Sequence, residues 1–241
     1  MPLPFFYVEA IAASENNVVL SEENSKHIVQ VLRMEPGEQL KLTDGKGNLY
    51  LAEITEAHKK KCAVKILSHQ KQERGERQAC IVVSPVKNNN RFEWFLEKAT
   101  EIGVSEIVPL ICSRTEKQHF RYDRMNGILI SAMLQSQQAW LPILHETVKY
   151  KDYIESIKSS ASRKFIAHCG DDEKVSLKQR LSELSSVNCH LSTILVGPEG
   201  DFTTEEIAQA LENNFTAVTL GDTRLRTETA ALVAAVMLCV S

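Results

Sequence analysis

The sequence predicts an α/β fold in which a C-terminal domain with a mainly parallel sheet follows a small N-terminal β-barrel. Up to about residue 70, short runs carry apolar side chains at every second position, which is typical of half-buried strands. Beyond residue 78, continuous apolar runs alternate with helical patterns, as in parallel sheets that helices cover on both faces. Residues 71–78 carry no apolar side chain and predict a linker, so we expect domains at 1–70 and 79–241.

The first domain is expected to combine short strands with one helix. The strands are predicted at residues 5–8, 39–42, 49–54 and 62–67. Residues 44–47 (Asp-Gly-Lys-Gly) predict a hairpin turn, because glycine adopts the positive φ that tight turns require. Ser21 is a typical helix N-cap, and Ile28, Val31 and Leu32 supply an apolar stripe for the helix that follows.

The second domain is expected to alternate strands and helices. Strands are predicted at residues 80–84, 106–110, 165–169, 191–196 and 217–220, with a weaker one at 143–145. Helices are predicted at residues 91–102, 121–138, 151–159, 176–185, 204–213 and 228–239. Thr203 and Glu206 form a capping-box pattern. The last helix is apolar on nearly all sides and must be buried on more than one, so we expect it between the sheet and a second subunit of a homodimer.

Composition narrows the function classes. The formal net charge of −3 predicts no general attraction to nucleic acid or membranes, so any RNA surface is a local patch. The six cysteines form no Cys-x-x-Cys pair or other ligand spacing, which predicts reduced thiols and no metal site. The longest apolar run, residues 230–240, is too short to span a bilayer, and the N-terminus lacks a basic signal-peptide region. We therefore expect a cytoplasmic protein.

Two glycine-containing loops near the C-terminus carry the functional signal. Residues 197–200 (Gly-Pro-Glu-Gly) end one predicted strand, and residues 221–226 (Gly-Asp-Thr-Arg-Leu-Arg) end the next strand in the sequence. Each loop is followed by a helix start. Glycine lets main-chain groups approach a ligand closely, and open α/β sheets bind ligands at the carboxyl ends of their strands. We therefore expect the two loops to end adjacent strands and to form one pocket for a small polar cofactor.

These loops and their flanks resemble the signature of the bacterial 16S ribosomal RNA uridine N3-methyltransferases. The matching segments are Leu-Val-Gly-Pro-Glu-Gly-Asp-Phe at 195–202 and Leu-Gly-Asp-Thr-Arg-Leu-Arg-Thr-Glu-Thr-Ala-Ala at 220–231. The likeness extends upstream through residues 27–33, 87–104, 109, 113–114 and 135–138, so it covers nearly the whole chain in order. Asp201 departs from the family, where a glycine is usual, and Pro4 stands where an arginine is usual.

The resemblance implies a more specific fold and a cofactor. The family belongs to the SPOUT class, whose C-terminal α/β domain is tied in a trefoil knot, and its N-terminal barrel is PUA-like. Its members bind S-adenosylmethionine in a bent form through main-chain groups of the two loops. The cofactor-binding residues implied here are Leu195, Val196, Gly197, Glu199, Gly200, Leu220, Gly221, Leu225, Arg226, Thr227, Glu228 and Thr229.

The chemistry of the implied reaction assigns roles to two arginines. Uridine N3 carries a proton that must leave before the nitrogen can attack a methyl group, so a catalyst must stabilise the imide anion. Arg224 and Arg226 are the candidate catalytic residues for this task. Glu199 and Glu228 both qualify as proton acceptors, although a carboxylate at a helix start such as Glu228 also serves structure.

The implied RNA partner is small-subunit ribosomal RNA, either free or within the 30S subunit. A target base must be unstacked to enter a pocket at a sheet edge, so we expect a uridine in a loop or single strand. The candidate RNA-binding residues are His27, Arg33, Lys87, Arg91 and Arg114.

Two alternatives stay open from the sequence. One is a SPOUT methyltransferase that modifies another RNA position, either a ribose 2′-oxygen or a transfer RNA. The other is a non-catalytic RNA-binding factor in ribosome assembly that keeps the fold.

Overall fold

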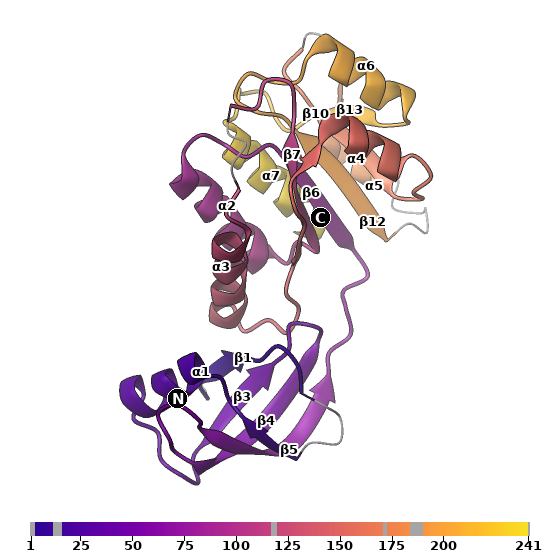
Figure 1. Ribbon diagram of the computed structural model, residues 1–241. Helices are drawn as coiled ribbons and strands as arrows, with labels where there is room; N and C mark the ends of the chain where they lie inside the picture. The colour runs from indigo at the N-terminus through magenta and orange to yellow at the C-terminus, as the bar shows by residue number, and fades with distance from the viewer. Residues whose placement is uncertain (1–2, 12–15, 117–119, 171–172, 184–189, 241) are drawn as a thin grey trace. The chain divides into compact units, whose positions relative to one another are not determined.

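The computed structural model describes residues 3–11, 16–116, 120–170, 173–183 and 190–240, and these form two compact units (Figure 1). The first unit comprises Met1–Arg74 together with Ile130–Leu141, and the second comprises the rest. The sequence predicts residues 130–141 to be part of the C-terminal domain. They group with the first unit because main-chain hydrogen bonds join this segment to the 44–47 turn. Gly47 N–H donates to the Ala139 carbonyl (2.9 Å) and Leu141 N–H to the Gly45 carbonyl (2.8 Å).

The first unit contains a curled sheet. Its order is β1 (Phe5–Tyr7), β3 (Gln39–Thr43), β4 (Asn48–Glu56), β5 (Ala63–Lys71) and β2 (Asn17–Val19). The predicted hairpin turn joins β3 and β4, with Gly45 at φ 69° and Gly47 at φ 86°. Strand β5 continues to Lys71 because it pairs along the whole length of β4, so the connection to the next strand is shorter than the predicted linker.

The helix of this unit differs from the predicted apolar pattern. Ser21 caps α1 (Glu22–Lys26) as predicted, its side chain accepting from the Asn24 N–H (3.2 Å). The chain then widens into a π-helical turn, η1 (His27–Val31). Because a π turn holds more residues than an α turn, residues three and four apart no longer share one face. The predicted stripe is therefore wrong in part, since Ile28 is buried but Val31 and Leu32 are exposed.

The second unit is built on a largely parallel sheet, as predicted. Among the described residues its strands are β6 (Gln78–Val83), β7 (Glu106–Ile111), β8 (Ile143–Leu144), β9 (Val148–Lys149), β10 (Arg163–Ala167), β11 (Val175–Ser176), β12 (Leu191–Val196) and β13 (Thr216–Thr219). The order is β11-β13-β10-β12-β6-β7-β8, with β9 beside β7, and every pairing in it is parallel.

Helices cover both faces of this sheet. They are α2 (Asn89–Ile102), α4 (Tyr150–Ile157), α5 (Leu177–Glu183), α6 (Thr204–Glu212) and α7 (Thr227–Val240), whereas α3 (Tyr122–Gln135) begins in this unit and ends in the segment that groups with the first. Side chains alternate between the faces of a strand, so Cys80 and Val82 of β6 pack in the cluster beneath α4 and α6, while α7 packs on the other face beside α2. None of the described helices is long and apolar enough to cross a bilayer.

The predicted boundaries of another strand are also wrong, and this difference affects the site. The strand expected at residues 165–169 runs from Arg163 to Ala167. Its polar start is stabilised by pairing, since Arg163 and Lys164 lie opposite Ser192 and Thr193 of β12, and the Lys164 ammonium donates to the Lys158 carbonyl (3.0 Å). Because the strand ends at Ala167, His168 and Cys169 lie in the loop that follows it.

Candidate functional site

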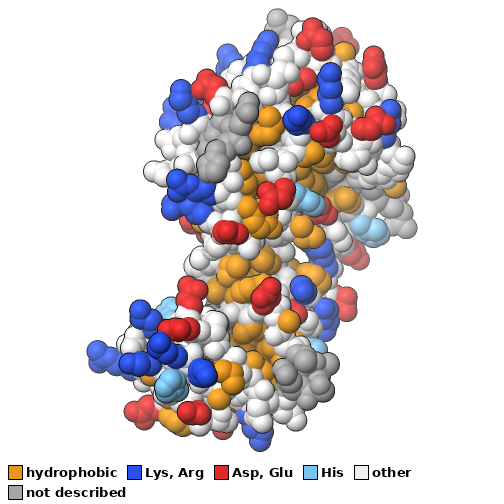
Figure 2. Space-filling view, viewed as in Figure 1, with side chains coloured by type: hydrophobic (Ala, Val, Ile, Leu, Met, Phe, Trp, Pro, Cys, Tyr) orange, Lys and Arg blue, Asp and Glu red, His pale blue; other side chains and the backbone are white. Residues whose placement is uncertain are grey.

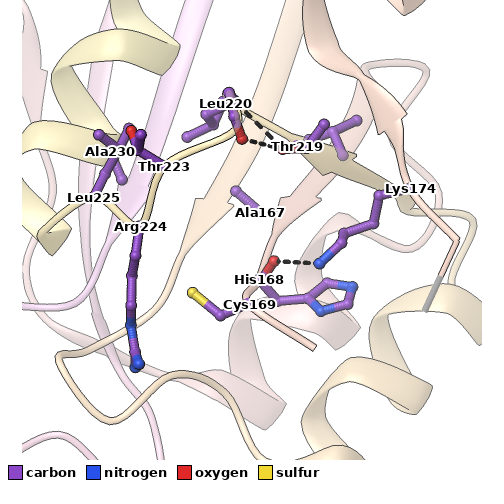
Figure 3. Close-up of a pocket in the computed structure, with 12 residues that line it drawn as sticks. Ala167, His168, Cys169, Lys174, Thr219, Leu220, Thr223, Arg224, Leu225 and Ala230 are labelled. Carbon is purple, nitrogen blue, oxygen red and sulfur yellow. Dashed lines mark hydrogen bonds between the residues drawn. The ribbon is translucent and has the colours of Figure 1, made fainter. Parts of the chain in front are cut away.

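Two adjoining cavities lie at the carboxyl ends of the parallel strands. The smaller, about 300 Å³, is lined mainly by the ends of β10 and β13 and the loop after β13 (Figure 3). The larger, about 400 Å³, is lined by the end of β12, the loop after it and the start of α7. The cavities share a set of lining residues: Ala167, Cys169, Arg224, Leu225 and Ala230. Two molecules bound there would therefore lie against each other.

The loop after β12 is tightly constrained. A Cβ atom in place of the Gly197 hydrogen would lie 3.1 Å from the Phe202 ring, so a side chain there would force Phe202 to shift. The guanidinium of Arg114 donates to the carbonyls of Gly200 (2.7 Å) and Phe202 (3.4 Å). Glu199 accepts from the main-chain N–H of Lys87 (3.2 Å), which connects this loop to the one before α2. The main chain of the larger cavity is thus held from both sides.

The capping box at α6 also contributes to this support. The Thr203 side chain accepts from the Glu206 N–H, and the Glu206 carboxylate accepts from the Thr203 N–H, as the sequence predicted. The same buried carboxylate accepts from Ser113 in the loop after β7. Burial, followed by the charge of Glu206, raises the pKa of both the Cys112 thiol and the Tyr150 hydroxyl.

The loop after β10 forms a wall of the site that the sequence did not predict. The ammonium of Lys174 donates to the His168 carbonyl (3.0 Å) and to the Gly170 carbonyl. The Cys169 N–H donates to the carboxylate of Asp201 (2.8 Å) in the loop after β12. Figure 3 shows His168, Cys169 and Lys174 on one side of the smaller cavity and Thr223, Arg224 and Leu225 on the other.

The strand order explains why this loop reaches the site. The expectation that β12 and β13 are neighbours was wrong, because β10 lies between them and pairs with both. The carboxyl end of β10 therefore opens between the two predicted loops. The available sequence signal was the predicted strand at 165–169, since any parallel strand of this sheet ends at the same edge.

Most of the predicted cofactor residues meet at the cavities. Those lining the larger cavity are Val196, Gly197, Glu199, Arg226, Thr227 and Glu228. Leu220 and Gly221 line the smaller cavity, and Leu225 lines both. Leu195, Gly200 and Thr229 line neither. Leu195 is fully buried in the core beside Val82 and Ile166, so its side chain points away from the site. Lining residues that were not predicted are Ala167, His168, Cys169, Lys174, Pro198, Asp201, Val218, Thr219, Thr223 and Ala230.

The two predicted catalytic arginines are exposed at the cavities. Arg224 lines both, and Arg226 lines the larger. Glu228, in the first turn of α7, is buried, and its carboxylate lies 3.7 Å from Nε of Arg91. Arg91 also lines the larger cavity, so this predicted RNA residue lies within the site itself.

The other predicted RNA residues are dispersed. Lys87 is exposed and pairs with Glu116 (3.1 Å), whereas the Arg114 side chain is engaged by loop carbonyls. His27 and Arg33 belong to the first unit, where His27 packs edge-on against Phe6. Figure 2 shows Lys and Arg side chains gathered over the part of that unit that carries α1. Within the described chain, no cluster of three or more His, Cys, Asp or Glu side chains could hold a metal ion.

Comparison with known proteins gives a consistent set of relatives. The family model described as RNA methyltransferase domain matches residues 73–239, and the one described as RNA methyltransferase PUA domain matches residues 20–67. The ribosomal RNA small subunit methyltransferase E of Rickettsia conorii is 27% identical over 230 residues, which cover 95% of this chain and 91% of the relative.

Solved structures agree over almost the full length. A probable rRNA-methyltransferase from Porphyromonas gingivalis superposes with a TM-score of 0.86 at 35% identity, covering 97% of this chain and 95% of the other. A ribosomal RNA small subunit methyltransferase E from Neisseria gonorrhoeae, bound to S-adenosyl methionine, superposes with a TM-score of 0.83 at 30% identity, with the same coverage.

Proposed function

The chain belongs to the RNA methyltransferase domain family, and from this premise we propose that it transfers the methyl group of S-adenosylmethionine to N3 of a uridine in small-subunit ribosomal RNA. The observation that carries the proposal is the pair of adjoining cavities that share Arg224. A two-substrate transfer needs two molecules held in contact, with positive charge where the acceptor becomes an anion. Relatives named for this class of reaction match over nearly the whole chain.

The lining residues fit S-adenosylmethionine. The smaller cavity has apolar walls from Val218, Leu220 and Ala230, which suit a purine ring. The larger cavity, which the acceptor would enter, adds the exposed carboxylate of Glu199 and the guanidinium groups of Arg224 and Arg226. When bound, S-adenosylmethionine supplies an electrophilic methyl group that needs no metal for activation.

The side chains of the protein act on the uridine. Arg224 and Arg226 stabilise the imide anion that forms when N3 loses its proton, because a guanidinium donates charge-assisted hydrogen bonds to carbonyl oxygens that carry the charge. Of the two carboxylates considered for the proton, Glu228 is buried against Arg91. Glu199 is exposed in the larger cavity and is the better placed acceptor.

The proposal extends to assembly and partners. The first unit, whose sequence matches a PUA domain, would bind the RNA through a surface that includes the exposed side chains of His27 and Arg33. The second unit would carry the trefoil knot of the SPOUT class and pair with a second copy through α7, which exposes Val236 and Val240. The substrate would be small-subunit ribosomal RNA, either free or in the 30S subunit.

Mass spectrometry of ribosomal RNA tests the reaction. A strain that lacks the gene should lose one 3-methyluridine from its small-subunit RNA, and the purified protein with S-adenosylmethionine should restore it. An unchanged 3-methyluridine content would refute the assignment to N3. Loss of a ribose 2′-O-methyl group or of a transfer RNA methyl group would instead support another SPOUT substrate. Calorimetry that shows no S-adenosylmethionine binding would support a non-catalytic assembly factor.

A further inference from the structure

Asp201 joins two loops that follow neighbouring strands. Its Oδ2 accepts from the Cys169 N–H (2.8 Å) in the loop after β10, and its Oδ1 accepts from the Phe202 N–H (2.9 Å) in its own loop. Strands β10 and β12 are paired up to Ala167 and Val196, so the two loops leave the same edge of the sheet. Both loops line the larger cavity, and the carboxylate bridges them directly.

The backbone at this position is unfavourable for a residue with a side chain. Asp201 has φ 61°, in the left-handed region that glycine adopts freely and L-residues adopt at a cost. Its N–H donates to the Pro198 carbonyl (2.9 Å), so the conformation belongs to a closed turn. Asp is among the side chains that tolerate this region, and here it adds two acceptors that glycine lacks. The carboxylate therefore offsets a local conformational cost.

The loop that Asp201 holds is fastened from its other side as well. Lys174 binds the carbonyls of His168 and Gly170, while Asp201 binds the N–H of Cys169 between them. Each of the three residues 168–170 thus has a main-chain group that is hydrogen-bonded to a side chain outside this segment. Cys169 is part of the wall that both cavities share. A loop fixed in this way keeps its shape before a ligand enters.

We propose that Asp201 is a positioning residue for S-adenosylmethionine, which acts by holding the loop of residues 168–170 in its binding conformation. This inference rests on the proposed function. Ordering a loop when the cofactor binds costs free energy. Because the Asp201 hydrogen bond orders this loop beforehand, it improves cofactor affinity. The Asp201 side chain touches no reacting group, so its loss leaves the methyl-transfer step unchanged.

Calorimetric titration of S-adenosylmethionine into Asp201→Gly tests the proposal. Glycine removes both acceptors and relieves the left-handed strain, so the melting temperature should stay within about 3 °C of the wild-type value. The cofactor Kd should rise about tenfold, equivalent to about 1.4 kcal/mol. KM for S-adenosylmethionine should rise by the same factor while kcat at saturating cofactor changes less than about twofold. Asp201→Asn keeps one acceptor and should recover part of the affinity.

Asn214→Gly is the matched control, because Asn214 also has a left-handed backbone (φ 65°) but lines neither cavity. Its cofactor Kd should equal that of the wild type. An unchanged Kd in Asp201→Gly, an equal loss in Asn214→Gly, or no recovery in Asp201→Asn would overturn the proposal.

Hydrogen exchange separates this inference from the proposed function. In the cofactor-free protein, the amide of Cys169 should exchange faster in Asp201→Gly than in the wild type. Equal rates would show that the Asp201 carboxylate does not hold this amide in solution. Failure of the wild-type protein to bind S-adenosylmethionine would refute the proposed function, whatever the exchange result.

Discussion

The carboxylate of Glu206 accepts hydrogen bonds from both the N–H (2.8 Å) and the hydroxyl (3.0 Å) of Ser113, 93 positions away in the sequence. Its other oxygen caps α6 through the Thr203 N–H (2.9 Å). One buried side chain thus closes the first turn of a helix and attaches it to the loop after β7. Arg114, next to Ser113, then reaches the carbonyls of the loop that lines the larger cavity.

Removal of this carboxylate should destabilise the fold. Glu206→Ala leaves three donors without their acceptor, and we expect the free energy of unfolding to fall by about 2–4 kcal/mol. Urea unfolding followed by circular dichroism measures it. Glu205→Ala is the matched control, since Glu205 lies in the same helical turn but is exposed, and its loss should be below about 1 kcal/mol. Equal losses in the two variants would contradict the role given to Glu206.

Substitution of the two arginines at the cavities should slow methyl transfer more than it weakens cofactor binding. Arg224→Ala and Arg226→Ala each remove one charge from the site of anion formation, so kcat should fall about 100-fold. This fold-change in kcat should exceed any fold-change in the Kd for S-adenosylmethionine. Transfer of a radioactive methyl group to ribosomal RNA measures kcat, and calorimetry measures Kd. Lys151→Ala, an exposed change on α4 away from the cavities, should behave as wild type. Full activity in both arginine variants would exclude them from catalysis.

The pair formed by Arg91 and Glu228 should contribute modestly to stability. The charged atoms lie 3.7 Å apart, and the Arg91 side chain is 45% exposed, so water screens the attraction. A double-mutant cycle with Arg91→Ala and Glu228→Gln should give a coupling free energy of about 0.5–1 kcal/mol in urea unfolding. A coupling indistinguishable from zero would show that the two side chains do not interact in solution.

The fold should lose stability in alkali. Burial raises the pKa of the Cys80 thiol from 9.0 to about 12 and also raises the pKa of the Cys112 thiol. Above about pH 9 the unfolded chain loses these protons while the folded protein keeps them. Stability is therefore complete below pH 9 and falls as the pH rises toward 12, by about 1.4 kcal/mol per pH unit for each group. Urea unfolding between pH 7 and 11 measures this slope, which should be shallower in Cys80→Ala. A flat profile would contradict the prediction.

The proposed homodimer can be tested separately. Val236, on α7, is 42% exposed, and Val236→Glu should convert a dimer to a monomer because a carboxylate is costly in an apolar interface. Leu211→Glu on α6 changes a side chain of similar exposure (47%) and should leave the dimer intact. Light scattering gives the mass of each. A monomeric wild-type protein would refute the dimer.

Local pattern was sufficient for much of the fold. The strands β6, β7 and β12, the cap at Ser21, the turn at 44–47 and the capping box were all predictable, because each depends on the periodicity or hydrogen bonding of neighbouring residues. The loops at 197–200 and 221–226 were also recognisable, since glycine and charge at a strand end have a local meaning. Most of the predicted cofactor residues indeed line the two cavities.

Only the tertiary structure decided how these pieces meet. Strand order in a parallel sheet depends on crossovers between distant segments, so nothing local shows that β10 lies between β12 and β13. That order brings Cys169 to Asp201, 32 positions away, and so gives the site its third wall. Arg114 is a candidate RNA contact in the sequence, and the structure shows that its guanidinium also donates to the carbonyls of Gly200 and Phe202. The sequence by itself determined the chemistry that each loop can offer, and long-range pairing determined which loops share a cavity.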